Sequence, residues 1–173
     1  MHRLPKLKHI TVDPYQRSQL MRAASLGDLT AVRQELERAA NVNETDLAGG
    51  TALHWSANEG HLQVVRELLT CGAAIEAKAH NGDTPLTLAA ACGRTEVAKL
   101  LLSEGADVNV HDVVGQTALM KAVLSRDEAL VQLLIASGAI TDAVNIRGHS
   151  ASDMANFAGG ESIRKVIVDA TKG

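Results

Sequence analysis

The pattern of apolar and polar residues is clearest in the middle of the chain, over the stretch TPLTLAAACGRTEVAKLLLSEGADVN (residues 84–109). Its apolar positions recur three and four residues apart, as they do on the buried face of an amphipathic helix. Thr84 can cap a first helix through its hydroxyl, and Pro85 suits the first helical position. Glycine accepts the left-handed conformation that ends a helix, so we expect helix ends at Gly93 and Gly105. The stretch predicts two short helices joined by a glycine turn.

The same pattern recurs every 33 residues along the chain. The predicted N-caps in phase with one another are Thr51, Thr84 and Thr117. The glycines in phase with one another are Gly49, Gly82, Gly115 and Gly148. So many residues in one phase indicate a repeat architecture, in which each unit buries its apolar face against its neighbours.

The segments TALHWSANEGHLQVVRELLTCGA, TPLTLAAACGRTEVAKLLLSEGADVN and TALMKAVLSRDEALVQLLIASGA resemble the ankyrin repeat. The family pattern is a turn, then T-P-L-H-x-A-A, a glycine, and V-V-x-L-L-x-x-G-A-D-V-N. The resemblance covers roughly residues 14–168. It implies an all-α solenoid of helix-turn-helix units joined by finger loops.

On this resemblance we expect a single domain over residues 13–168. Its predicted units are 13–45, 46–78, 79–111, 112–144 and 145–168, and the first and last of these are caps. Residues 1–12 are expected to be a flexible lead-in, and residues 169–173 a frayed tail.

The first unit lacks the glycine that the other units carry in the finger loop, and its first helix is not preceded by a threonine. We expect its first helix to run from Pro14 to Leu26, with Asp13 as N-cap, and its second to run from about Leu29 to Ala39. Arg126 replaces a turn glycine in the fourth unit, so we expect that turn to be the least regular.

Histidine in the T-x-L-H box has a structural role in the family, where it ties the helix start to neighbouring loops. The resemblance therefore implies such a role for His54. Thr87, Met120 and Asp153 occupy its place in the later units. A metal site shared by His54 and His61 is the alternative, and it would require the turn between them to fold both side chains together.

Charge and cysteine content narrow the partners and the compartment. The net charge of −3 disfavours nucleic acid, because phosphate binding needs clustered Lys and Arg. Two isolated cysteines, Cys71 and Cys92, do not make a disulfide framework, so we expect a reducing, cytoplasmic environment. We also expect the chain to be a monomer. No apolar run reaches membrane-spanning length. The basic start MHRLPKLKHI leaves a targeting segment as an alternative, although Pro5 would interrupt an amphipathic helix there.

No recognised catalytic, nucleotide-binding or metal motif occurs in the chain. Ser150 follows His149, but Ser150 holds the N-cap phase of the threonines, and capping accounts for it. We therefore expect neither enzyme activity nor a cofactor nor a bound metal.

In the family, finger positions and the turn-side ends of the inner helices line a concave binding face. The resemblance implies partner contacts by Leu47, Trp55, His80, Asn81, Asp83, Val113, Val114, Gln116, Leu124, Ile146, Arg147 and Phe157. Apolar residues at hairpin tips, such as Val113, Val114 and Ile146, could serve a partner or could pack between adjacent fingers. Partial packing is likewise the alternative for Trp55.

The function that follows from this resemblance is recognition of a protein partner by an interaction module or adaptor. A regulatory or inhibitory subunit that blocks an enzyme partner's site would use the same surface. An enzyme would instead need polar groups that converge in a pocket.

Overall fold

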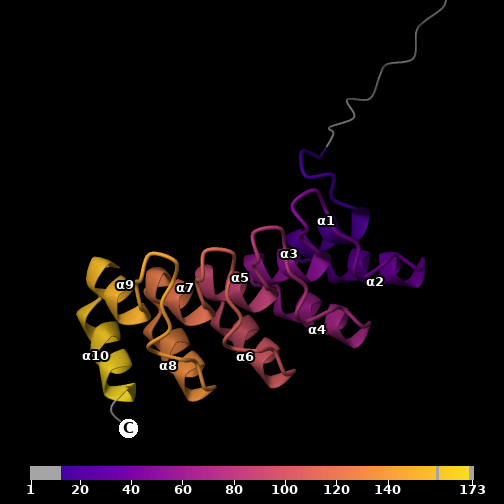
Figure 1. Cartoon of the computed structure of the whole chain (residues 1–173). Coiled ribbons are helices and arrows are strands. Elements are labelled where there is room, and N and C mark those ends of the chain that lie inside the picture. The colour runs from indigo at the N-terminus through magenta and orange to yellow at the C-terminus, as the bar shows by residue number, and fades with distance from the viewer. Residues whose placement is uncertain (1–12, 159, 172–173) are drawn as a thin grey trace, which may run out of the picture.

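The computed structural model describes residues 13–158 and 160–171, which form five successive pairs of helices (Figure 1). The helices are α1 Gln19–Leu26, α2 Leu29–Glu37, α3 Ala52–Glu59, α4 Leu62–Thr70, α5 Pro85–Ala91, α6 Thr95–Ser103, α7 Ala118–Ser125, α8 Glu128–Ala136, α9 Ala151–Ala158 and α10 Glu161–Ala170. The described residues contain no β-strand. Two isolated antiparallel β-bridges occur at the bases of fingers, His111–Thr117 and Val144–Ser150. The predicted all-α solenoid is confirmed.

The helices stand in two rows, with the odd-numbered helices nearer the finger loops (Figure 1). Each helix packs against its partner in the same pair and against the next helix of its own row. Leucines with at most 2% exposure recur at the same inner-row position, at Leu20, Leu53, Leu86 and Leu119. Fully buried small residues recur in the outer row, at Val32, Val65, Ala98 and Val131. Full burial of a leucine stabilises by about 1.5–3 kcal/mol, so the repeated positions build one continuous apolar layer.

The first helix begins later than the sequence predicts. We expected it to start at Pro14 with Asp13 as the N-cap, but α1 starts at Gln19 and Ser18 is its N-cap. The Ser18 hydroxyl accepts a backbone N–H at 3.3 Å. Ser18 lies one period before Thr51, so the cap follows the register of the repeat.

The residues before this cap form a finger. The Asp13 carboxylate accepts the Tyr15 backbone N–H at 3.0 Å and the Arg17 side chain at 2.9 Å. Gln16 has a φ of 51°, in the place that Gly49 holds one period later. Because its oxygens are used inside this turn, Asp13 does not cap a helix. The first unit therefore has the same plan as the others.

Two further boundaries differ from the prediction by two residues. α2 ends at Glu37 rather than at Ala39, and α10 continues to Ala170, past the predicted end of the last unit. The predicted lead-in, residues 1–12, and the last two residues lie outside the described part of the chain.

The turn at Arg126 keeps the geometry of its glycine counterpart. Arg126 has a φ of 60° and ends α7 in a left-handed cap, as Gly60 ends α3 with a φ of 87°. Its guanidinium donates a hydrogen bond to the Ala158 carbonyl at 2.6 Å. The expectation that this turn would be the least regular is therefore wrong, since a contact with the next unit holds it.

Adjacent fingers are joined by one backbone hydrogen bond each, in the same phase throughout. The bonds run from Leu47 N–H to Tyr15 O (3.1 Å), His80 N–H to Ala48 O (2.8 Å), Val113 N–H to Asn81 O (3.0 Å) and Ile146 N–H to Val114 O (3.1 Å). At Gly82 the approach leaves no room for a side chain: a Cβ there, at a φ of 83°, would lie 2.8 Å from the Val113 nitrogen.

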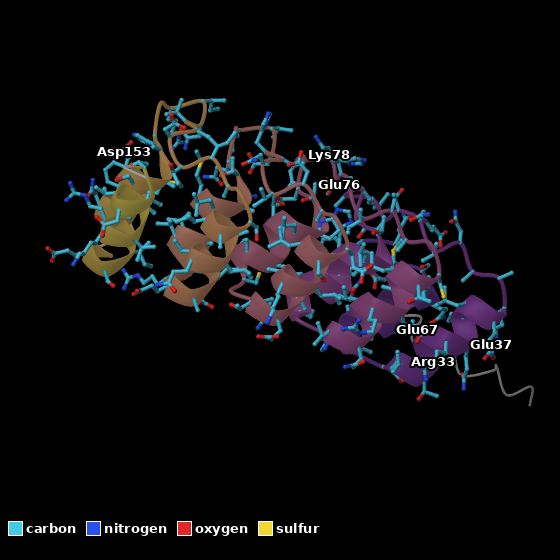
Figure 2. The ribbon with its side chains drawn as sticks, turned by 90° about the horizontal axis from the view of Figure 1, so that it is seen from below. Arg33, Glu37, Glu67, Glu76, Lys78 and Asp153 are labelled. Atoms are coloured by element: carbon cyan, nitrogen blue, oxygen red, sulfur yellow. The ribbon has the colours of Figure 1, made fainter. Side chains whose placement is uncertain are left out.

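A buried lysine joins the third and fourth units. Lys121, on α7, is 8% exposed. Its ammonium lies 2.9 Å from Asp112 of its own finger and also pairs with Asp83 of the preceding finger. Burial tends to raise the pKa of Asp112, but hydrogen bonds from Lys121 and the Gln116 N–H hold it below its ordinary value. The triad differs from the exposed pair of Arg33 and Glu67, which joins α2 and α4 at 2.8 Å (Figure 2).

We predict that Gly105→Val lowers the free energy of unfolding by about 1–3 kcal/mol, because a β-branched residue is strained at positive φ. Gly105 has a φ of 94°, and nothing lies within 4 Å of the position of a Cβ, so the cost arises in the backbone alone. The matched control is Glu104→Val, an exposed neighbour with a φ of −87°. Equal urea midpoints for the two variants would contradict the prediction.

We predict that Lys121→Met lowers the free energy of unfolding by about 3–5 kcal/mol, because two carboxylates would stay buried without a cation. Adding Asp112→Asn should restore part of the loss by removing one of them. Arg33→Ala, which breaks the exposed ion pair, should cost much less. Urea unfolding of the three variants measures this, and a Lys121→Met loss no larger than that of Arg33→Ala would show that the triad contributes little.

Candidate protein-binding surface

The finger tips present apolar side chains to solvent. One equivalent finger position carries an apolar side chain in three fingers, and it is 59% exposed at Leu47, 66% at Val113 and 72% at Ile146. With this exposure, Leu47, Val113 and Ile146 are not packed between adjacent fingers. Val114, at 39%, is also exposed. The alternative that the valines and Ile146 pack between fingers is therefore wrong.

Six of the predicted contact residues come together at the end of the array, around a hollow of about 330 Å³ between the last two fingers and inner helices. We call it the C-terminal hollow, and its predicted lining residues are Val114, Gln116, Leu124, Ile146, Arg147 and Phe157. Leu124 and Phe157 hold the same position on α7 and α9, and they are 50% and 72% exposed. The hollow is thus apolar, with polar groups at its edge.

The predicted contact residues do not include three residues of this hollow, Asn145, His149 and Met154. The His149 ring meets Phe157 edge-on, with centroids 5.1 Å apart. This contact fixes Phe157 on one side and leaves most of its surface open. His149 is a finger position, like Ile146 and Arg147, but its contact with Phe157 joins the finger to α9 and is not visible in any local sequence pattern.

A second hollow, of about 360 Å³, lies between the second and third units. We call it the central hollow. It includes the predicted residues Trp55, His80, Asn81 and Asp83, together with Asp46, Ala48, Asn58, Ala79 and Leu88. Leu47 and Val113 line neither hollow.

Trp55 is half-buried, so the packing alternative holds in part. Its indole N–H donates to the Asp46 carboxylate at 2.9 Å. The Arg17 guanidinium lies 4.6 Å from the Trp55 ring centroid, and the Tyr15 ring meets it edge-on at 5.6 Å. Trp55 therefore joins the first finger to the second unit while it lines the central hollow.

Asp83 is not an exposed contact residue. It is 5% exposed, and its carboxylate accepts hydrogen bonds from Thr87 and Asn81, each at 2.8 Å, and from Lys121. The prediction placed Asp83 on the partner-binding face from its position in the finger alone. The structure instead makes it a support beneath the exposed His80 and Asn81.

The buried contacts of Trp55 and Asp83 depend on two positions of the repeat, a finger position and a helix position nine residues later. Units two and four pair an aspartate with a donor there, Asp46 with Trp55 and Asp112 with Lys121. The third unit carries an alanine and Leu88 at these positions. Both positions therefore change together from unit to unit, and this joint change in the sequence indicates that the two side chains are in contact.

His54 has the structural role that the resemblance implies. It is 2% exposed, its Nδ1 accepts the Thr51 N–H at 3.2 Å, and its Nε2 therefore donates to the Asp83 carbonyl at 3.1 Å. Burial lowers its pKa, so the ring is neutral. The other candidate, Ser150, accepts the Asp153 N–H at 3.2 Å, which is a helix-capping contact.

Residues 13–158 and 160–171 contain no group of three or more His, Cys, Asp or Glu side chains arranged to hold a metal ion. None of the described helices is long and apolar enough to cross a membrane.

Comparison with known families agrees with this architecture. A family model described as "Ankyrin repeats (3 copies)" matches residues 20–112, and one described as "Ankyrin repeat" matches residues 114–148. A search of curated proteins finds no significant match. With most of its length matched, the chain belongs to the ankyrin-repeat family, whose repeats are generally protein–protein interaction modules.

Proposed function

We propose that this chain is an adaptor that binds a protein partner through the C-terminal hollow and the fingers beside it. One observation carries the proposal: large apolar side chains stand exposed together at Leu124, Ile146 and Phe157. Contiguous exposed apolar surface on a water-facing protein marks an interaction site. Burial against a partner would stabilise the complex by roughly 25 cal/mol per Å² of apolar surface removed from water, before the costs of association.

The edge of this surface suits a protein partner. Gln116, Arg147 and His149 surround the apolar centre, and an apolar centre within a polar rim is the usual plan of a protein interface. An exposed aromatic side chain such as Phe157 is also a frequent anchor of such interfaces. These features support direct contact with another protein rather than with nucleic acid.

The setting that we propose is cytoplasmic, and the chain itself is proposed to be a monomer. Cys71 and Cys92 are free and exposed, which suits a reducing compartment. An inhibitory subunit would use the same surface, with an enzyme as its partner.

We predict that Ile146→Asp combined with Phe157→Ser weakens partner binding more than tenfold, which corresponds to about 1.4 kcal/mol. The change removes the two most exposed apolar side chains of the hollow and adds a charge that the partner would have to desolvate. Partner capture from an extract of the native cell, followed by titration of the purified partner, measures the effect.

The matched control is Gln63→Asp with Gln132→Asp, which adds charge on exposed positions of the outer helices α4 and α8. Both double variants should melt within a few degrees of the unchanged chain, because the altered side chains are exposed. Equal capture by the two variants would reject the C-terminal hollow as the binding site.

A further inference from the structure

One buried carboxylate beneath the concave face has no cationic partner among the described residues. Asp13, Asp46 and Asp112 hold the same position in three fingers. Asp13 pairs with Arg17 at 2.9 Å and Asp112 with Lys121 at 2.9 Å. Asp46 is 7% exposed and makes no ion pair in the described part of the chain. It also lines the central hollow.

The hydrogen bonds of Asp46 all come from neutral donors. Oδ1 accepts the backbone N–H groups of Ala48 at 2.8 Å and Gly50 at 2.9 Å, and Oδ2 accepts the Trp55 indole N–H at 2.9 Å. An ionised carboxylate offers about four acceptor sites, so Oδ2 retains one. Hydrogen bonds to a cation are roughly twice as strong as those between neutral groups. The remaining site therefore favours a charged donor.

The hollow around Asp46 has the form of a side-chain pocket. Ala48, Trp55, Ala79 and Leu88 give it mostly apolar walls, and its volume is about 360 Å³. No lysine or arginine is among the lining residues, and the other lining carboxylate, Asp83, is already paired with Lys121. Apolar walls with an anionic group suit a side chain that has a long aliphatic stem and a positive head.

The indole of Trp55 already accommodates a cation within this protein. The Arg17 guanidinium lies 4.6 Å from its ring centroid, inside the range of a cation–π contact, and tryptophan is the most favourable aromatic partner for one. Trp55 thus contacts an internal guanidinium and also lines the hollow that contains Asp46.

We propose that the central hollow receives a cationic side chain, arginine or lysine, from the protein partner. Its stem packs on Trp55 and Leu88, and its head donates to Asp46 Oδ2. The inference rests on the proposed function in requiring a protein partner, but it concerns a different part of the surface from the C-terminal hollow. A partner that fills both hollows carries a basic side chain and, two units away, an apolar group.

The only tryptophan of the chain reports on this site directly. The probes are acetyl-Gly-Arg-Gly-amide, its lysine counterpart and a neutral analogue in which citrulline replaces arginine. NMR follows the single indole N–H signal, whose hydrogen bond ends on Asp46. We expect a saturable shift with a cationic peptide, at least fivefold weaker binding of the citrulline peptide, and further weakening in 0.5 M salt.

Asp46→Asn tests the carboxylate in the same assay. The chain itself shows that asparagine fits this finger position, since Asn145 Oδ1 accepts the Arg147 and His149 N–H groups at 2.9 and 3.1 Å. Asp46→Asn should weaken binding of the arginine peptide at least fivefold. The control, Glu59→Gln, removes an exposed charge from the end of α3 and should change binding by less than twofold.

Three results would each overturn the inference. They are no saturable shift with either cationic peptide, equal binding of the arginine and citrulline peptides, and unchanged binding by folded Asp46→Asn. The arginine and citrulline comparison uses the unchanged chain, so it decides the matter even where Asp46→Asn unfolds. If the Ile146→Asp, Phe157→Ser variant loses the partner but the unchanged chain binds no cationic peptide, only this inference fails. If the unchanged chain binds a cationic peptide but that variant keeps the partner, only the proposed function fails.

Discussion

Close approach of neighbouring units is the constraint on which the rest of the structure depends. Fully buried alanines recur at Ala24, Ala57 and Ala90, where the inner helices meet, and glycine at Gly82 lets one finger touch the backbone of the next. A unit of two short helices cannot bury its apolar face alone. Its stability therefore comes from contacts that small residues permit with its neighbours.

That constraint also separates two kinds of position. Residues that repeat in every unit serve the stack, and residues that change from unit to unit are free to face solvent or a partner. Leu124 and Phe157 stand at one such variable position and remain exposed. Trp55 and Lys121 stand at another, and there the change from unit to unit alters the contacts between units as well as the surface. A position that varies between units can therefore also contribute to the packing of the stack.

The helices, their period and their buried faces could be predicted because they depend on spacing along the chain. The start of α1 could not be decided from Asp13 alone, since aspartate can both cap a helix and close a turn, but the phase of Ser18 with Thr51 contained the answer. The sequence left open whether Val113 and Ile146 are exposed or packed between fingers, and only the arrangement of the fingers decides for exposure. The burial of Asp83 could not be predicted from its finger alone, because one of its partners, Lys121, lies 38 residues later in the chain. The hollows arise where side chains of different units meet, which no local pattern specifies.

The single hydrogen bonds between fingers have a consequence for recognition. Each bond fixes the step from one finger to the next, as in the contact from Ala48 to His80. The distance between the central and C-terminal hollows is therefore set by the number of repeat units between them and not by the length of a loop. A partner that used both hollows would therefore meet them at a fixed spacing. Side-chain changes would alter what each hollow binds, but only the gain or loss of a whole unit would change the spacing.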